Sequence, residues 1–441
     1  MKTPISDFIE EYKSKDPLRF HTPGHKGVGS LGYETEDITE IAGADSLYFA
    51  SGIIEESEQN ASKLFGSYKT FYSCEGSSLS IRAMLYLAMT NRKAQQGNFV
   101  LATRNAHSSF ITASQLLGFD VEWIFGEKSY LSSDLTEEKL EKVLGSVDIL
   151  PFALYVTSPD YLGNMLDIEA LSRVCKKYGI LLLVDNAHGA YLKFLTPSLH
   201  PLDLGADMCC DSAHKTLPVL TGGGYLHISK ANPALARGAK GALALFGSTS
   251  PSYLILNSLD RANAYLESGY VQRLNDFVSL ANDAKKHLRV SGFEVLVSEP
   301  LKLVIATKSI GYYGYELGSL LEKMNIYPEF YDRDFIVFML SPEKPESLLA
   351  LESALLSLVR KPAIRENAPK VMQAKKLLTP REALFCQKED VSIDDANGRI
   401  LGASAISCPP AVSLVVCGEM INDDIISACK YYGIKSLTVI R

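Results

Sequence analysis

The chain has 441 residues, of which 46% are hydrophobic and 22% charged, the composition of a globular protein with a sizeable core. Its length suits two or three domains rather than one. The 44 basic and 51 acidic residues give a formal net charge of −7, so we expect neither nucleic acid nor an anionic membrane surface as a partner.

The first residues and the cysteines favour a cytoplasmic location. The opening stretch, "MKTPISDFIEEYKSKDP", carries acidic residues early and has no apolar segment, so it is not typical of a secretory signal. No run of 18 apolar residues occurs, and we therefore expect no membrane span. The eight cysteines form no CxxC pair, which argues against a zinc site and fits a reducing compartment.

Short apolar segments alternate with amphipathic ones between about residues 66 and 230. The pattern predicts helices at 108–118, 135–147 and 166–179, and strands at 99–104, 119–125, 149–158, 180–185, 206–212 and 223–229. Strands separated by helices indicate βαβ units and therefore a mostly parallel sheet between helices. In such sheets, ligands bind beyond the carboxyl ends of the strands.

The remainder of the chain predicts smaller parts. Helical periodicity extends over 252–288, and strands at 293–307 and 335–340 belong to a small α+β unit. We expect an α/β fold in four segments: an N-terminal arm with dimer contacts (1–65), a large cofactor-binding domain (66–260), a connecting helix with a small α+β domain (261–367), and a short C-terminal domain (368–441).

Polar side chains follow the predicted strands of the large domain. They are Asn105, His107, Asp160, Asp185, His188, Asp211, Ser212, His214 and Lys215. A turn at Gly76-Ser77-Ser78 also joins a strand to the start of a helix. Taken singly, each has an ordinary explanation, such as a capping serine or a solvated lysine. Because the ends of parallel strands meet at one edge of a sheet, we expect the set to lie together.

This combination suits pyridoxal phosphate chemistry. The amine of Lys215 would form the imine with the cofactor aldehyde, and the carboxylate of Asp185 would keep the pyridine nitrogen protonated. The Gly76–Ser78 turn would offer donors to the phosphate, and the flat side chain of His107 can stack on the ring. Lys215 follows Asp185 by thirty positions, which is enough for a connection and one more strand.

The chain resembles the ornithine/lysine/arginine decarboxylase family of the aspartate-aminotransferase fold, in its short form without the additional wing domain. The motifs that carry the resemblance are "FHTPGHKG" (20–27), "TEIAGADSL" (39–47), "RNAHSS" (104–109), "DNAHGAY" (185–191), "SAHKTLP" (212–218), "STSPSYLILNSLD" (248–260) and "CPPAVSLVVCGE" (408–419). The sequence departs from the family pattern at Glu75, Asn186, Ala411, Ser413 and Cys417. These departures concern the substrate more than the reaction.

The resemblance implies a fold type I enzyme that uses pyridoxal 5'-phosphate. It implies that Ser212 binds the cofactor phosphate, that His188 contacts the cofactor, and that His214 lies near the imine. Thr249 and Ser250 would reach the cofactor phosphate of a neighbouring subunit, in a homodimer or a higher homo-oligomer.

The implied reaction is the decarboxylation of arginine, lysine or ornithine to a polyamine-type amine, with arginine slightly ahead. Lys215 or His214 would return a proton to Cα. Glu419, at the end of the last motif, is the candidate partner for a cationic substrate, because a buried charge needs an opposite charge; its alternative is an ordinary place near the start of a helix. Two other functions stay open: another pyridoxal phosphate enzyme, either an aminotransferase or a lyase acting at Cβ, and a non-catalytic relative.

Overall fold

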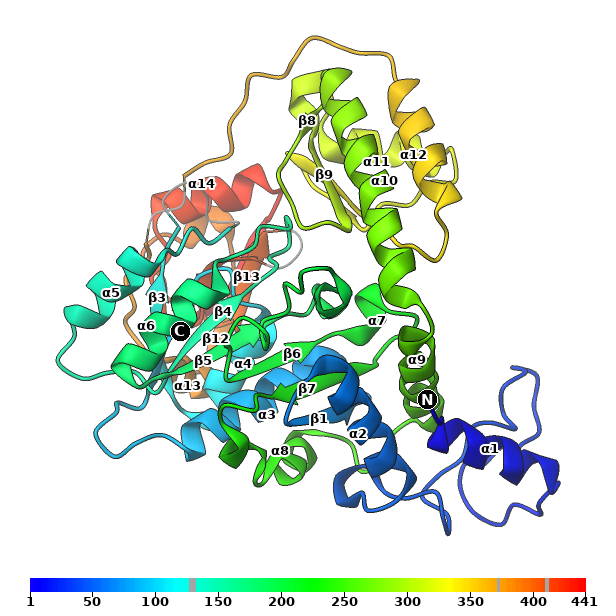
Figure 1. Ribbon diagram of the computed structural model, residues 1–441. Helices are drawn as coiled ribbons and strands as arrows, with labels where there is room; N and C mark the ends of the chain where they lie inside the picture. The colour runs from blue at the N-terminus through cyan, green and yellow to red at the C-terminus, as the bar shows by residue number, and fades with distance from the viewer. Residues whose placement is uncertain (127–131, 371–372, 409–411) are drawn as a thin grey trace. The chain divides into compact units, whose positions relative to one another are not determined.

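The computed structural model describes residues 1–126, 132–370, 373–408 and 412–441 (Figure 1). These residues form two compact units. The first consists of Met1–Gly97, Glu141–Val156 and Ile168–Gln272, and the second of Asn98–Leu140, Thr157–Asp167 and Arg273–Arg441. Because the units are assembled from interleaved stretches of chain, the division into four consecutive segments stays a prediction.

Five strands of the first unit lie in the order β1 (Lys69–Ser73), β7 (Gly224–Ile228), β6 (Met208–Asp211), β5 (Leu181–Asp185) and β4 (Ala153–Thr157). The order of this sheet continues with β2 (Phe99–Thr103) and β3 (Asp120–Ile124), which belong to the second unit and pair in parallel. β5 and β6 are also parallel, with Asp185 opposite Cys210. The predicted mostly parallel α/β sheet is confirmed.

β7 runs antiparallel to both of its neighbours, β6 and β1. The hydrophobic pattern predicts this strand but not its direction. Residues 212–223, which include the short helix α7 (Ala213–Thr216), connect it to β6.

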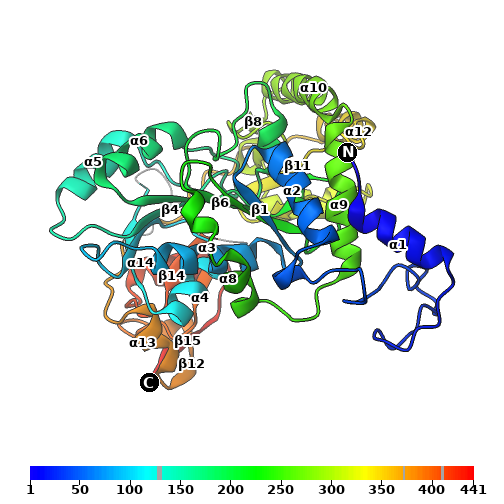
Figure 2. The same cartoon turned by 60° about the horizontal axis from the view of Figure 1, so that its bottom comes forward.

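Helices of the first unit cover its strands. α3 (Gly76–Thr90) packs against β1, β5, β6 and β7, and α6 (Ile168–Tyr178) packs against β5. The buried residues of α6 include Ile168, Leu171, Ser172 and Cys175, whose spacing places them on one helical face. The other helices are α1 (Pro4–Ser14), α2 (Ile53–Phe65), α8 (Ala239–Phe246) and α9 (Tyr253–Glu267), with 3-10 turns at Leu47–Phe49, Ala190–Phe194 and Pro233–Ala236. Figures 1 and 2 both show α1 beside α9, against which it packs.

The long helical stretch expected at 252–288 consists of two helices, α9 and α10 (Tyr270–Val290). They are separated at Ser268 and Gly269. Gly269 has a φ of +74°, a left-handed backbone conformation that glycine adopts without a clash of a Cβ atom. Periodicity predicts helix on both sides of this point, but it does not show the break between them.

The second unit contains a four-stranded antiparallel sheet in the order β10 (Phe330–Tyr331), β11 (Phe335–Met339), β9 (Lys302–Ala306) and β8 (Glu294–Val295). Its C-terminal part has two antiparallel pairs, β12 (Lys388–Ser392) with β15 (Ser436–Ile440) and β13 (Ala405–Cys408) with β14 (Val412–Val416). The helices of this unit are α4 (Ser108–Leu117), α11 (Gly314–Glu322), α12 (Glu346–Leu356), α13 (Pro380–Phe385) and α14 (Asp423–Tyr431), with 3-10 turns at Thr307–Ile310 and Ile393–Asp395. A division between the units falls inside α5 (Glu137–Gly145) and another inside α10.

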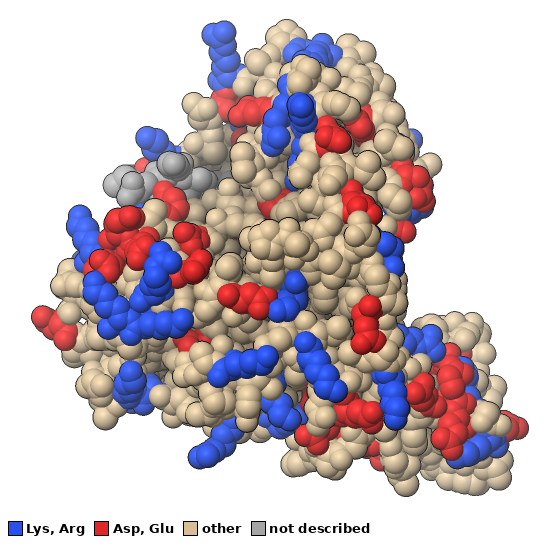
Figure 3. All heavy atoms as spheres, in the orientation of Figure 1, with Lys and Arg blue, Asp and Glu red and all other residues tan. Residues whose placement is uncertain are grey.

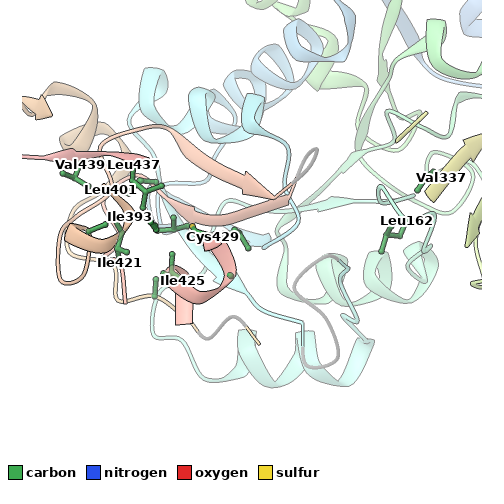
Figure 4. Packing of buried hydrophobic residues seen from close by; sticks show 14 of the residues in the cluster. Leu162, Val337, Ile393, Leu401, Ile421, Ile425, Cys429, Leu437 and Val439 are labelled. Carbon is green, nitrogen blue, oxygen red and sulfur yellow. The ribbon is translucent and has the colours of Figure 1, made fainter. Parts of the chain in front are cut away.

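The C-terminal part of the second unit buries apolar residues from its strands, its loops and α14 (Figure 4). Those labelled in the figure are Ile393, Leu401, Ile421, Ile425, Cys429, Leu437 and Val439. Because these residues come from segments throughout 393–439, the C-terminal part has a core to which both antiparallel pairs contribute.

Acidic and basic side chains are interspersed over the face shown in Figure 3, as the near balance of charges in the sequence leads one to expect. Among the described helices, none combines the length and the apolar composition that a bilayer crossing requires.

Candidate active site

Asp185 is the last residue of β5, and only 1% of it is exposed. Its Oδ2 accepts a hydrogen bond from the hydroxyl of Tyr155 at 3.0 Å, and its Oδ1 accepts one from the amide of Ala187 at 3.2 Å. Tyr155 lies on the adjacent strand β4, and burial raises the pKa of its hydroxyl well above the usual value, so this group stays a donor. The carboxylate is thereby held in one orientation at the end of its strand.

Lys215 lies on the short helix α7, which follows β6. Its backbone amide donates to the carbonyl of Ser212 at 3.0 Å, and its Nζ donates to Nε2 of His188 at 3.1 Å. The neighbouring His214 donates from Nδ1 to the carbonyl of Gly223 at 2.9 Å, which fastens α7 to the residues before β7. The first unit therefore brings the predicted lysine and two predicted histidines into one short region.

The predicted phosphate turn joins β1 to α3. Gly76, the first residue of α3, has a φ of +64°, and its amide donates to the carbonyl of Gly222 at 2.7 Å. The hydroxyl of Ser212 donates to that of Ser77 at 2.8 Å, and Ser78 is half-buried beside them. Two hydroxyl groups predicted to bind phosphate thus meet at the N-terminus of a 15-residue helix, where backbone amides and the helix dipole favour an anion.

A fully buried polar cluster surrounds Asp211, the last residue of β6. The Oδ2 of Asp211 accepts hydrogen bonds from Nε2 of His200 and Nε2 of His227, both at 3.1 Å, and its Oδ1 accepts one from Nδ2 of Asn186 at 2.7 Å. Burial alone would raise the pKa of this carboxyl, but the two histidines hold it well below the usual range. We did not predict this cluster, because His200 and His227 lie outside the motifs and no local pattern links them to Asp211 and Asn186.

His107 lies in the second unit, at the start of α4, and the amide of Ser109 donates to its Nδ1 at 3.1 Å. It therefore also acts as the N-cap of this helix. Asn105, two residues earlier, is only 6% exposed, and neither its Nδ2 nor its Oδ1 has a hydrogen-bond partner among the described residues. A buried amide without partners costs about 1–3 kcal/mol, so Asn105, which the sequence places among the polar residues that follow strands but to which it gives no role, is a candidate ligand contact.

Glu419 forms a buried ion pair with Arg104 inside the second unit. The guanidinium donates from Nη1 to Oε1 at 2.9 Å and from Nη2 to Oε2 at 2.7 Å, and the amide of Val416 adds a bond to Oε2 at 2.9 Å. The two side chains are 5% and 2% exposed. Because Arg104 already supplies the cation, these contacts do not support the predicted role of Glu419 as the partner of a cationic substrate.

Thr249 and Ser250 are exposed and lie in the loop before α9. The amide of Ser248 in the same loop donates to the carboxylate of Glu75 at 2.6 Å, so the loop contacts the phosphate turn of its own chain. Its predicted reach to a neighbouring subunit stays a prediction. In the C-terminal motif, residues 409–411, which include the departure at Ala411, lie outside the described residues.

The side chains of the first unit suit pyridoxal phosphate by their chemistry. Asp185 offers a buried carboxylate for a protonated ring nitrogen, and Lys215 offers an amine that already lies against an imidazole. Ser77 and Ser212 offer hydroxyl groups beside helix amides for a phosphate. The set of donors and acceptors therefore fits the functional groups of this cofactor, while the role of each residue stays a prediction.

A mostly parallel sheet with helices and such a set at its strand ends defines the pyridoxal-phosphate-dependent enzymes of fold type I. Solved structures agree on the fold. The lysine decarboxylase LdcF of Francisella novicida superposes with a TM-score of 0.81 at 17% identity, over 100% of this chain and 81% of that one. Lysine decarboxylase A of Pseudomonas aeruginosa gives 0.80 at 16% identity, over 99% and 80%.

The family model "Orn/Lys/Arg decarboxylase, major domain" matches residues 3–298, and the chain belongs to this family. The uncharacterized protein YaaO of Bacillus subtilis (strain 168) is 30% identical over 96% of this chain and 93% of its own length. The arginine decarboxylase of the same organism is 27% identical, over 97% and 92%. The chain is accordingly a pyridoxal-phosphate-dependent amino-acid decarboxylase, as the sequence motifs predicted.

Proposed function

We propose that this enzyme decarboxylates a basic amino acid, with arginine preferred over lysine and ornithine. The observation that supports the cofactor is the presence, in one unit, of a buried carboxylate at the end of β5 and a lysine after β6. The match of residues 3–298 to the decarboxylase family supports the reaction class. The relatives from Bacillus subtilis, Halalkalibacterium halodurans and Bacillus anthracis that are named arginine decarboxylases, 27–28% identical over at least 96% of this chain, support arginine.

Each residue of the first unit has a proposed task toward the cofactor. Asp185 would face the ring nitrogen, Lys215 would hold the aldehyde carbon, and Ser77 and Ser212 would donate to the phosphate. When bound, pyridoxal phosphate supplies an electron-withdrawing ring that accepts the electrons of the broken Cα–carboxylate bond. The two hydrogen bonds to Asp185 keep the carboxylate aimed, so its charge is in place without reorganisation.

We propose that Lys215 and the neighbouring histidines, His188 and His214, carry out the proton transfers. Its Nζ lies 3.1 Å from Nε2 of His188, so a proton can pass between amine and imidazole within hydrogen-bond distance. His214 is held to the carbonyl of Gly223 through Nδ1, which leaves Nε2 as the ring atom that can exchange a proton. We assign the return of a proton to Cα to Lys215 or His214.

We also propose that the enzyme works as a homodimer or a higher homo-oligomer. Large apolar side chains of the N-terminal arm are exposed in the single chain, including Leu18, Val28, Leu31 and Phe20, which is 92% exposed. Apolar side chains gathered in one short segment mark an interaction surface. A second copy of the chain is the proposed occupant, because Thr249 and Ser250 would then be placed to reach a neighbouring site.

A cytoplasmic location is part of the proposal. The seven cysteines whose side chains are described carry free thiols, as a reducing compartment requires.

Product analysis tests the reaction. The cofactor-loaded enzyme is incubated separately with arginine, lysine and ornithine, and CO₂, amine and keto acid are measured, with Lys215→Ala as the control. We expect one CO₂ and one amine per substrate consumed, fastest with arginine. Keto acid without CO₂ would instead indicate the aminotransferase alternative, and the absence of any product from all three would remove the substrate class.

A further inference from the structure

The buried pair of Arg104 and Glu419 joins the C-terminal part of the second unit to the end of β2. Arg104 is the first residue after β2, and its amide donates to the carbonyl of Ile124 at 3.0 Å. Its guanidinium also donates to the carbonyl of Leu414 at 3.3 Å, beside the two bonds to Glu419. The backbone of Arg104 is therefore held by strand β3, and its guanidinium by the C-terminal part.

Aromatic rings enclose the guanidinium of Arg104. Its central carbon lies 5.0 Å from the ring centroid of Trp123 and 5.3 Å from that of Phe125, within the range of cation–π attraction. Trp123 is the only tryptophan of the chain. Its fluorescence therefore reports on the position of this one cation without interference from other indoles.

The energetics of the pair point to a role beyond joining two parts. Two charges taken out of water lose their hydration, and apolar side chains of similar volume would give a contact that is as stable or more stable. What an ion pair with two parallel hydrogen bonds adds is a fixed geometry. The geometry is fixed at the start of the turn that leads to His107.

The turn itself is short and constrained. The amide of Ala106 donates to the carbonyl of Thr103 at 3.2 Å, and the amide of Phe110 donates to the carbonyl of His107 at 2.9 Å. Only Asn105 and Ala106 thus separate the anchored Arg104 from His107, with hydrogen bonds on both sides. A displacement of Arg104 would move the imidazole.

We infer that Glu419 is a positioning residue: by clamping Arg104 it sets the orientation of the 104–107 turn and of the His107 imidazole. This inference rests on the proposed stacking role of His107. It gives the C-terminal part an indirect role in the reaction, which Glu419 exerts through Arg104 and the 104–107 turn and not by contact with substrate.

The test replaces both charges by apolar side chains, in Arg104→Met/Glu419→Leu, so that no buried charge is left alone. Because such a replacement conserves volume, the double variant is expected to keep the unfolding midpoint of the wild type. Arg104→Lys, which keeps the charge but not the two parallel bonds, is the second variant in case the first does not fold. Glu389→Gln, which breaks the Arg399–Glu389 pair in the C-terminal part, and Lys376→Met, which removes the contacts of Lys376 with Asp120 and Glu122, are the matched controls.

Three signals are recorded on protein loaded with pyridoxal phosphate: the emission of Trp123, the visible circular dichroism of the bound cofactor, and kcat and KM. We expect the double variant to change the Trp123 emission, to lose most of the visible circular dichroism, and to lower kcat about a hundredfold, as for a reacting group displaced by about 1 Å. Arg104→Lys should show the same three changes at a smaller size. The two controls should leave the circular dichroism unchanged.

The inference is overturned if the double variant, folded and with altered Trp123 emission, keeps the wild-type circular dichroism and kcat. It is also overturned if Lys376→Met has the same effect as the double variant. The cause would then be the loss of any contact between the C-terminal part and β3, and not the loss of the Arg104–Glu419 pair in particular. His107→Ala separates the inference from the proposal on which it rests: if that variant alone leaves the circular dichroism unchanged, the stacking role is wrong. If His107→Ala alters it, combining it with the double variant should add little further change.

Discussion

Asp211→Asn is the substitution for which the structure gives the clearest energetic consequence. The aspartate accepts charge-assisted hydrogen bonds from His200 and His227, and no part of it is exposed. The amide of Leu202 lies 3.4 Å from Nδ1 of His200, so this ring donates from Nε2 toward position 211. An asparagine can keep the bond from Asn186 through its oxygen, but its amide group would then meet the donor of His200.

The expected cost follows from these contacts. A hydrogen bond to a charged group contributes about 1.5–3 kcal/mol, and two such bonds are lost while a buried donor is left without an acceptor. Removing one partner of a buried charged cluster costs about 3–5 kcal/mol in general, which agrees with this sum. We therefore expect the local stability of β6 and β7 to fall by about 3–5 kcal/mol.

Native-state hydrogen exchange measures this quantity strand by strand. A loss of 3 kcal/mol or more corresponds to exchange that is faster by about a hundredfold or more in β6 and β7, since each 1.4 kcal/mol is a factor of ten. Asp203→Asn is the control, because Asp203 pairs with Lys193 near the surface, where an ion pair contributes about 0–1 kcal/mol. If the two variants lose protection equally, the buried cluster does not stabilise these strands as we argue.

The same cluster determines whether the stability of β6 and β7 rises or falls with pH. The histidines hold the pKa of Asp211 well below its usual range despite burial, and burial lowers the pKa of His227 although Asp211 opposes this. Groups whose pKa is depressed on folding stabilise the protein at higher pH, and this contribution is lost as the pH falls through their folded pKa values. Protection of β6 and β7 should therefore decrease below about pH 6, first through His227. The difference between wild type and Asp211→Asn should shrink below about pH 4, where the carboxyl of Asp211 begins to be protonated in the unfolded chain while the folded protein still holds it ionised.

Four further results are expected. Lys215→Ala should abolish turnover and the visible absorbance of the bound cofactor, and borohydride reduction of the wild type followed by peptide mapping should place the pyridoxyl group on Lys215 and on no other lysine. Asp185→Asn should lower kcat more than it weakens cofactor binding, and an unchanged kcat would contradict the electron-sink role. Asn105→Ala should leave the free protein as stable or more stable, because it removes two unsatisfied buried atoms, yet weaken cofactor or substrate binding about tenfold, equivalent to about 1.4 kcal/mol; unchanged binding would show that no ligand uses this amide. Phe20→Ser should shift the oligomer toward monomer by light scattering, and an unaltered mass would remove the N-terminal arm from the interface.

Local patterns predicted the elements of the fold well, because each strand and helix is a property of its own stretch of sequence. The apolar run at 180–185 became β5, and the amphipathic 166–179 became α6, which ends before the left-handed Gly179. Strand direction and helix breaks depend on distances and on single backbone angles. This is why the antiparallel β7 and the break at Gly269 were not predicted.

In the candidate site, too, local features could be predicted and contacts between distant segments could not. Asp185 and Lys215 could be predicted because both directly follow strands, and the topology of a parallel sheet brings such positions to one edge. Contacts between distant segments could not be predicted, because a pair such as Arg104 and Glu419 is 315 positions apart and leaves no periodic signal. Its place at the end of the last motif and its acidity suggested a substrate contact for Glu419, whereas in the structure it is paired with Arg104.

The position of the two reactive groups depends on how β5 and β6 are joined. Asp185 lies opposite Cys210, and the residues that follow them in the chain, Asn186 and Asp211, are linked by a side-chain hydrogen bond of 2.7 Å. The amide of Asn186 also donates to the carbonyl of Cys210 at 3.0 Å. An acid at position 186 would place a second negative charge against Asp211. The asparagine therefore suits the buried aspartate of this chain, and together they fix the carboxylate at the end of β5 relative to the strand that leads to Lys215.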